Sequence, residues 1–195
     1  MNGPNGGLLF NGPTGAWAKS RENWQKRTLI DDDGDGYTAK LTATAQKIVV
    51  EGLAAYDSVE VEYGVLLNAS SLPIYLYVRQ NDAASDANLA HQTDGGLAFA
   101  GTWSRGTAAR VIASGDGARA QFCGRFCFKL ADDGTSRIAL ASGVVLRSDN
   151  VVERIEDSGI AYFAAGTISS LAVFTDTANG MNIGSWFKFY GVTND

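Results

Sequence analysis

The chain has 195 residues, of which 45% are hydrophobic and 10% aromatic, and this is enough apolar material for the core of one β-sandwich domain. Its formal net charge is −5 and it has no cluster of Lys and Arg, which argues against nucleic acid as the main partner. No apolar run approaches the ~18 residues of a membrane-spanning helix, and the N-terminus lacks the pattern of a secretory signal peptide. We therefore expect a protein that is made in a cytoplasm and has no membrane partner.

Residues 1–22 are predicted to form an extended N-terminal arm. Their composition, which includes two Asn-Gly-Pro units, cannot bury enough apolar surface to fold alone. One interpretation is a disordered tail. The favoured interpretation is an arm that docks on another subunit, because a solvated tail has little reason to carry an apolar cluster. The residues expected to dock are Leu8, Leu9, Phe10 and Trp17.

Residues 23–195 form the body of the chain, which contains many short apolar runs separated by Gly, Asp and Asn. Their number and shortness predict an all-β antiparallel sandwich or barrel rather than a parallel α/β sheet. The polar stretch Asn81–Gly96 is expected to be the main surface loop, where contacts with a partner often lie. The expected strands are 26–30, 37–42, 46–53, 57–67, 72–80, 97–104, 108–114, 119–130, 136–147, 151–157, 160–164, 167–175 and 184–191.

The first loop of the body, D-D-D-G-D-G from residue 31, matches the start of a calcium loop of the EF-hand type. Asp31, Asp33 and Asp35 would supply the oxygen ligands at alternate positions. The twelfth position is Thr42 instead of the bidentate Glu, and the flanking residues alternate as in strands. An Asp/Gly turn without a metal is therefore the favoured interpretation, and a calcium site is the alternative. No other cofactor is expected.

The two cysteines, Cys123 and Cys127, lie four residues apart in an expected strand. Positions with this spacing share one face of a strand at about 13 Å, which is too far for them to chelate one zinc ion together. It is also too far for a disulfide between them, whose Cα separation stays below about 7 Å. Two reduced thiols are the favoured interpretation, and a disulfide between subunits is the alternative.

No catalytic site is expected. The single histidine, His91, lies in the polar stretch, and the chain has no G-x-S-x-G nucleophile motif. Glu60 and Glu62 alternate with apolar residues, as on the outer face of a half-buried strand, and not as the acid and base of a glycosidase. Tyr75 and Tyr77 share one face of a strand, where core or subunit-interface residues are the favoured interpretation and a sugar-binding surface is the alternative.

The C-terminal segment contains two strand-forming runs, 167–175 and 184–191, around a short polar break. This pattern predicts a β-hairpin with a longer loop. In the second run Trp186, Lys188 and Tyr190 alternate with Phe187 and Phe189, as in a strand.

Three stretches carry a resemblance to a known family. Ile168–Phe174 (I-S-S-L-A-V-F) and Gly184–Gly191 (G-S-W-F-K-F-Y-G) together resemble the C-terminal signature of small jelly-roll domains in tailed-bacteriophage virion proteins. Lys47–Gly64 resembles the opening strand pair of the same family, and Ser71–Arg79 resembles its next apolar strand. The resemblance runs from about Trp24 to the C-terminus and implies an antiparallel jelly-roll β-sandwich.

The resemblance also implies a virion structural protein that is synthesised in the cytoplasm of the bacterial host. The expected role is a surface component, either a capsid decoration or a spike, fibre or collar protein, whose partners are other virion proteins. The position on the particle is left open. The alternative is a receptor-binding module that uses the Asn81–Gly96 loop to contact host-surface glycans.

A homotrimer is expected, because jelly-roll domains of this kind commonly pack around a threefold axis. The sequence adds a physical reason. The chain has 4 Trp, 7 Tyr and 9 Phe, and aromatic residues in Ile74–Val78, Phe122–Phe128 and Trp186–Tyr190 are expected on both faces of their strands. Such a strand needs another surface outside its sheet, and closed symmetry is the usual way to provide one.

Overall fold

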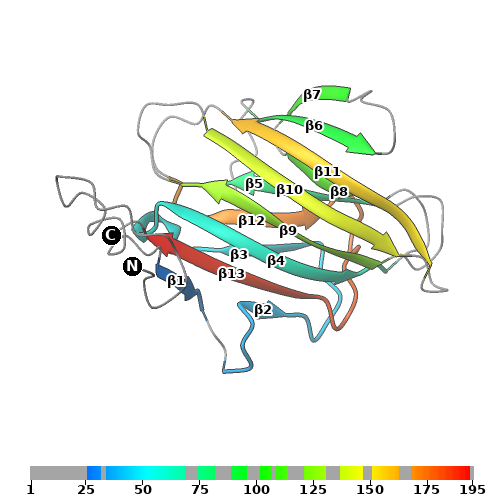
Figure 1. Ribbon diagram of the computed structural model, residues 1–195. Helices are drawn as coiled ribbons and strands as arrows, with labels where there is room; N and C mark the ends of the chain where they lie inside the picture. The colour runs from blue at the N-terminus through cyan, green and yellow to red at the C-terminus, as the bar shows by residue number, and fades with distance from the viewer. Residues whose placement is uncertain are drawn as a thin grey trace, which may run out of the picture.

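The described residues form two antiparallel β-sheets that lie one behind the other (Figure 1). Within this part of the chain there is no α-helix, and a single 3-10 turn, η1, spans Leu53–Ala55. The expected all-β antiparallel fold is therefore confirmed. The structure is a computed structural model, and it describes residues 26–31, 34–68, 74–81, 89–95, 102–106, 109–113, 121–130, 137–146, 151–162 and 168–193.

The larger sheet has nine strands and faces the viewer in Figure 1. The short β2 (Ala39–Lys40) pairs with one of them, β13, outside the main order. The other eight run in the order β1 (Lys26–Leu29), β13 (Trp186–Thr193), β4 (Ser58–Leu66), β9 (Gln121–Lys129), β10 (Arg137–Leu146), β11 (Val152–Tyr162), β6 (Leu89–Gly95) and β7 (Thr102–Gly106).

The smaller sheet has four strands, in the order β3 (Lys47–Val50), β12 (Leu171–Thr175), β5 (Tyr75–Gln80) and β8 (Ala109–Ala113). The chain moves between the two sheets at most of its connections. It places β3 in the smaller sheet, β4 in the larger, β5 in the smaller, β6 and β7 in the larger, and β8 in the smaller. Then β9, β10 and β11 form a meander in the larger sheet before β12 returns to the smaller sheet and β13 to the larger.

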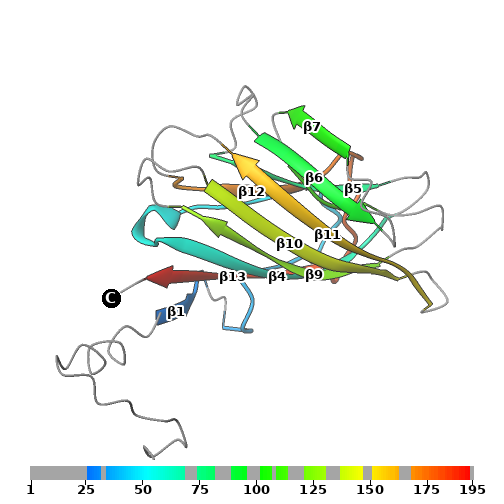
Figure 2. The same cartoon turned by 45° about the horizontal axis from the view of Figure 1, so that its top comes forward.

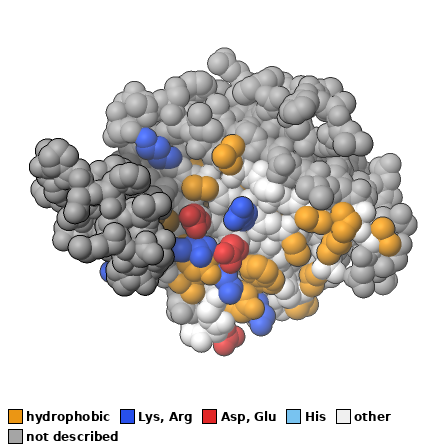
Figure 3. Space-filling view, in the orientation of Figure 1, with side chains coloured by type: hydrophobic (Ala, Val, Ile, Leu, Met, Phe, Trp, Pro, Cys, Tyr) orange, Lys and Arg blue, Asp and Glu red, His pale blue; other side chains and the backbone are white. Residues whose placement is uncertain are grey.

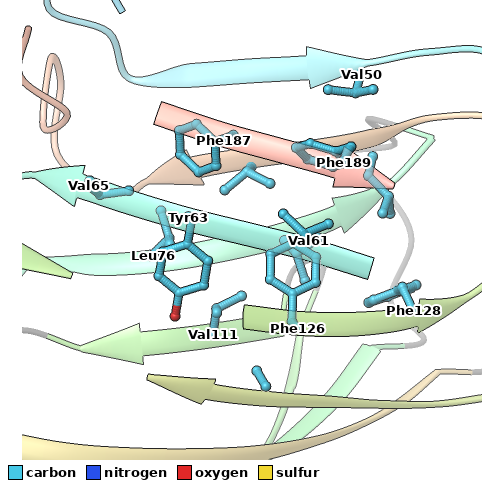
Figure 4. Close-up of a cluster of buried hydrophobic side chains, with 14 of the residues drawn as sticks. Val50, Val61, Tyr63, Val65, Leu76, Val111, Phe126, Phe128, Phe187 and Phe189 are labelled. Atoms are coloured by element: carbon cyan, nitrogen blue, oxygen red, sulfur yellow. The ribbon is translucent and has the colours of Figure 1, made fainter. Parts of the chain in front are cut away.

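The core lies between the sheets and consists of the inward-facing residues of both (Figure 4). The ring of Phe126 is central: its centroid lies 6.2 Å from that of Tyr63 and 6.4 Å from that of Phe189. Gly124 lies opposite Tyr63 in the pairing of β9 with β4. A Cβ atom at Gly124 would lie 2.6 Å from the Tyr63 hydroxyl oxygen, so the missing side chain makes room for the phenol.

The expected aromatic residues on both strand faces are confirmed only for β13, where Trp186 and Tyr190 are half-buried and Phe187 and Phe189 are buried. In β9 the expectation is wrong. Phe122, Phe126 and Phe128 are all buried, because their even spacing puts them on one face. In β5 the tyrosines face outward and aliphatic residues face the core.

The expected C-terminal β-hairpin is wrong. β12 pairs with β3 and β5 in the smaller sheet, whereas β13 pairs with β1, β2 and β4 in the larger sheet. The connection from 176 to 185 therefore crosses from one sheet to the other. Its backbone is held by other segments, since Met181 exchanges hydrogen bonds with Ala45, and Asn182 N–H donates to the Leu66 carbonyl.

Two further expectations need correction. The polar stretch Asn81–Gly96 is not all loop, because Leu89–Gly95 is strand β6, which pairs with β11 and β7. The two strands expected at 151–157 and 160–164 are one continuous strand, β11.

The arm at 1–22 lies outside the described residues. Figure 2 shows β1, the first described strand, beside β13 at the edge of the larger sheet.

Candidate functional site

A group of aromatic and basic side chains lies on the outer face of the larger sheet, at the edge where β2 meets β13. We call Tyr37, Lys40, Trp186 and Lys188 the Trp186 cluster. The alternation of β13 turns Trp186 and Lys188 outward, because Phe187 and Phe189 are buried in the core. Lys40 lies opposite Trp186 in the pairing of β2 with β13.

Hydrogen bonds fix the segment that carries Tyr37 against β13. Thr38 N–H donates to the Phe187 carbonyl at 3.0 Å, and the Thr38 hydroxyl accepts from Phe189 N–H at 2.8 Å. The same hydroxyl donates to the Ile30 carbonyl at 2.8 Å, which links the end of β1 to the segment. Both Tyr37 and Lys40 are therefore held beside β13 by the backbone around Thr38.

The rings and ammonium groups of the Trp186 cluster lie close together. The ring centroids of Tyr37 and Trp186 are 5.8 Å apart. Lys188 Nζ lies 4.8 Å and Lys40 Nζ 5.2 Å from the centroid of Tyr37, and Lys188 Nζ lies 5.9 Å from that of Trp186. Each distance is within the ~6 Å range of a cation–π interaction.

An ion-pair network borders the cluster. Lys188 lies opposite Glu62 in the pairing of β13 with β4, but the Glu62 carboxylate binds Arg27 at 2.9 Å. Arg27 Nε also lies 3.0 Å from Glu60, and its guanidinium stands 3.6 Å from the ring centroid of Tyr190. Burial lowers the pKa of Arg27, but the hydrogen bond to Glu62 and the nearby carboxylate charges outweigh it, so the pKa is raised.

The space-filling view shows the kinds of side chain on the outer face of the larger sheet (Figure 3). Acidic and basic side chains lie near one another in one part of the described surface, with hydrophobic side chains among them. Further hydrophobic side chains gather toward the right of the view. The exposed large hydrophobic residues of the described chain include Leu140, Val151, Val152 and Ile183.

A second aromatic surface lies on the outer face of the smaller sheet. The expectation that Tyr75 and Tyr77 share one face is confirmed, with ring centroids 6.0 Å apart. Tyr77 also stacks on Phe174 of β12, at 5.5 Å and an interplanar angle of 22°, and the Arg79 guanidinium lies 4.6 Å from the centroid of Phe174. We call Tyr75, Tyr77, Phe174 and Arg79 the Tyr77 ladder.

Cys123 and Cys127 are exposed, free and on the same outer face of β9, as expected for two reduced thiols. Burial raises the pKa of both thiols, and the negative charge of Glu60 raises that of Cys127 further. Glu60 lies directly opposite Cys127 in the pairing of β4 with β9. A disulfide between subunits stays a prediction.

Several of the predicted site residues lie outside the described residues: Leu8, Leu9, Phe10, Trp17 and Asp33. Asp31 and Asp35 are exposed on either side of the undescribed positions 32 and 33. Among the described residues, no group of three or more His, Cys, Asp and Glu side chains could hold a metal ion. The calcium site therefore stays a prediction.

Sequence reasoning missed four members of the two surfaces, which are Tyr37, Lys40, Phe174 and Arg79. The alternation in β13 already indicated that Trp186 and Lys188 share an outer face, but only strand pairing brings Lys40 to them. Within the described part of the chain, no helix is long and apolar enough to cross a membrane. The chain matches no model of a protein family, no curated protein and no solved structure.

Proposed function

We propose that this chain is a jelly-roll structural protein on the surface of a bacteriophage particle. The observation that carries the proposal is the order of strands in the two sheets. In an eight-stranded jelly roll, the first, eighth, third and sixth strands form one sheet, and the second, seventh, fourth and fifth form the other. Viral capsid domains are among the proteins built this way.

The strand orders support this assignment when the body is numbered from β3. The smaller sheet, β3-β12-β5-β8, then corresponds to the first, eighth, third and sixth strands. The larger sheet corresponds to the second, seventh, fourth and fifth strands if the meander β9-β10-β11 counts as the seventh. Within this sheet the meander lies between β4, the second strand, and the neighbouring β6 and β7, the fourth and fifth. β1, β2 and β13 extend this sheet beyond β4.

We further propose that the chain forms a homotrimer through the outer face of the smaller sheet. The described outward-facing residues of β12 and β5 there include the Tyr77 ladder, and Val49 of the neighbouring β3 is exposed. Aromatic residues and Arg are enriched in protein–protein interfaces, and acidic residues are depleted. The larger sheet is the weaker candidate, because Glu60, Glu62 and their ion pairs occupy its outer face.

Light scattering on the purified full chain tests the trimer. Tyr77→Glu would place a charge in the middle of the ladder and is expected to give monomers, whereas Leu140→Glu, a matched change at a 67% exposed position of the larger sheet, is expected to leave trimers. A monomer at micromolar concentration would contradict an intrinsic trimer. Imaging of phage particles that carry a labelled copy tests the virion location, and an unlabelled particle surface would contradict it.

In this proposal the role is structural and not catalytic, and residues 1–22 attach the domain to other virion proteins. The second candidate function is a receptor-binding module for host-surface glycans. The Trp186 cluster favours it, because two half-buried aromatic rings and two ammonium groups lie together on the outer face of the larger sheet. The Asn81–Gly96 stretch supports it less than expected, since strand β6 takes up Leu89–Gly95.

A further inference from the structure

We propose that the Trp186 cluster binds an acidic saccharide, with the sugar ring against the aromatic side chains and its carboxylate held by Lys40 and Lys188. The inference deepens the second candidate function by naming the site and the ligand class. It requires neither the virion location nor the trimer. The geometry that carries it is two ammonium groups placed around one phenol ring, next to an indole.

The two lysines lack a carboxylate partner in the described chain. Lys188 has Glu62 as its cross-strand neighbour, but Arg27 binds that carboxylate and the carboxylate of Glu60 as well. Neither lysine has an ion pair within the described residues. Two like charges near one ring repel each other, and an exposed cation–π contact offsets only about 0.5–1 kcal/mol. A bound anion near the two ammonium groups would lessen this repulsion.

The cluster also offers uncharged recognition. Within the described residues, neither the Trp186 indole N–H nor the Tyr37 hydroxyl has a hydrogen-bond partner, and neither is a buried unsatisfied group. The Tyr37 hydroxyl can therefore donate to a ligand. The indole packs against the backbone of β4 at Gly64, because this residue has no side chain that would displace the ring. Aromatic surface with a few fixed polar groups is typical of small-ligand sites.

Charge around the cluster favours a saccharide over a longer polyanion. Glu60 and Glu62 lie along β4 on the same outer face, and an Asp-rich stretch of sequence precedes Tyr37 in the chain. Nucleic-acid binding draws its affinity from many Lys and Arg contacts to phosphates, which a chain of net charge −5 does not offer here. A sugar that presents an apolar ring face and one carboxylate matches the two rings and two ammonium groups.

The test is calorimetric titration of the full chain with a galacturonic acid oligosaccharide, in parallel with its methyl ester. The ester keeps the sugar rings and removes the negative charge. We expect the acid to bind at low salt and the ester to bind about tenfold more weakly, a difference of about 1.4 kcal/mol. Lys40→Gln and Lys188→Gln are expected to weaken binding of the acid several-fold, while Lys47→Gln on the smaller sheet leaves it unchanged.

Equal binding of acid and ester, unchanged binding of the acid by the Lys40→Gln/Lys188→Gln variant, or no binding of the acid would overturn the proposal. Competition by inorganic phosphate or a single-stranded oligonucleotide as strong as by the acid would also overturn it, because the site would then recognise charge alone. The comparison of acid with ester needs no variant, so it stands even if a variant misfolds. Light scattering on the same samples shows whether the trimer is present. Loss of saccharide binding by a chain that is still a trimer would contradict the saccharide site alone, whereas a monomer that binds the acid would contradict the trimer alone.

Discussion

The indole of Trp186 packs directly against Gly64, its partner in the pairing of β13 with β4. A Cβ atom at Gly64 would lie 2.6 Å from Cε2 of the indole, and real Cβ atoms essentially never come so close to another heavy atom. Gly64 lies within a strand and its φ is not positive, so the backbone itself does not require glycine. The glycine is needed to seat the ring.

Gly64→Ala is therefore expected to displace the indole and to lower the free energy of unfolding by about 1–3 kcal/mol, the usual cost of overpacking. Urea denaturation followed by circular dichroism measures the change. The matched control is the same substitution in a Trp186→Ala background, where the added methyl group has nothing to displace and the cost is expected to vanish. An equal loss in both backgrounds would contradict the assigned role of Gly64.

Phe126→Ala is expected to be the more damaging change. The side chain is 2% exposed between the sheets, in contact range of Tyr63 and Phe189, and its removal leaves a cavity that the surrounding strands cannot fill. The expected loss of unfolding free energy is about 3–5 kcal/mol. Leu140→Ala on the adjacent strand β10 removes a side chain that is 67% exposed, and should cost less than about 0.5 kcal/mol. Similar losses for the two variants would contradict the position of the core.

Local alternation predicted which residues of β13 share a face, but it predicted neither which face is buried nor the partners of the strand. The buried face is the one with Phe187 and Phe189. The hairpin with β12 is wrong because a ten-residue connection can either turn back within one sheet or cross to the other. The crossing is held by hydrogen bonds of Met181 and Asn182 to Ala45 and Leu66, which are far away in sequence.

Strand β6 escaped prediction for a related reason. Leu89–Gly95 reads L-A-H-Q-T-D-G and lacks the apolar alternation of a half-buried strand. Its conformation is supported by backbone pairing with β11 on one side and β7 on the other. Pairing between distant segments also brings Lys40 to Trp186. For this reason the sequence pattern indicated only the two members of the cluster that lie on β13, Trp186 and Lys188.

The reactivity of the two thiols should depend on Glu60. The raised pKa of each thiol means that the reactive thiolate forms at a higher pH than for an ordinary cysteine. Glu60→Gln removes a negative charge that disfavours the thiolate of Cys127, so the pKa of Cys127 should fall and its alkylation by iodoacetamide should be faster at pH 8. Cys123, whose pKa is raised by burial alone, is the internal control. Mass spectrometry of the two peptides gives both rates in one sample, and an equal acceleration at Cys123 would contradict the role of Glu60.

Removal of residues 1–22 should leave the domain folded and abolish its attachment to the particle. The first described strand, β1, begins at Lys26 and pairs with β13 through Lys26–Leu29, so the deletion removes none of the described sheet. The apolar side chains Leu8, Leu9 and Phe10 would lose the partner surface that we propose for them. Circular dichroism measures folding, and co-sedimentation of the purified chain with particles that lack it measures attachment. A full-length chain in which these three residues are replaced by Ser keeps the length of the arm and removes its apolar groups. If this variant sediments with particles as well as the unmodified chain does, the arm is a tail and attachment must come from the body.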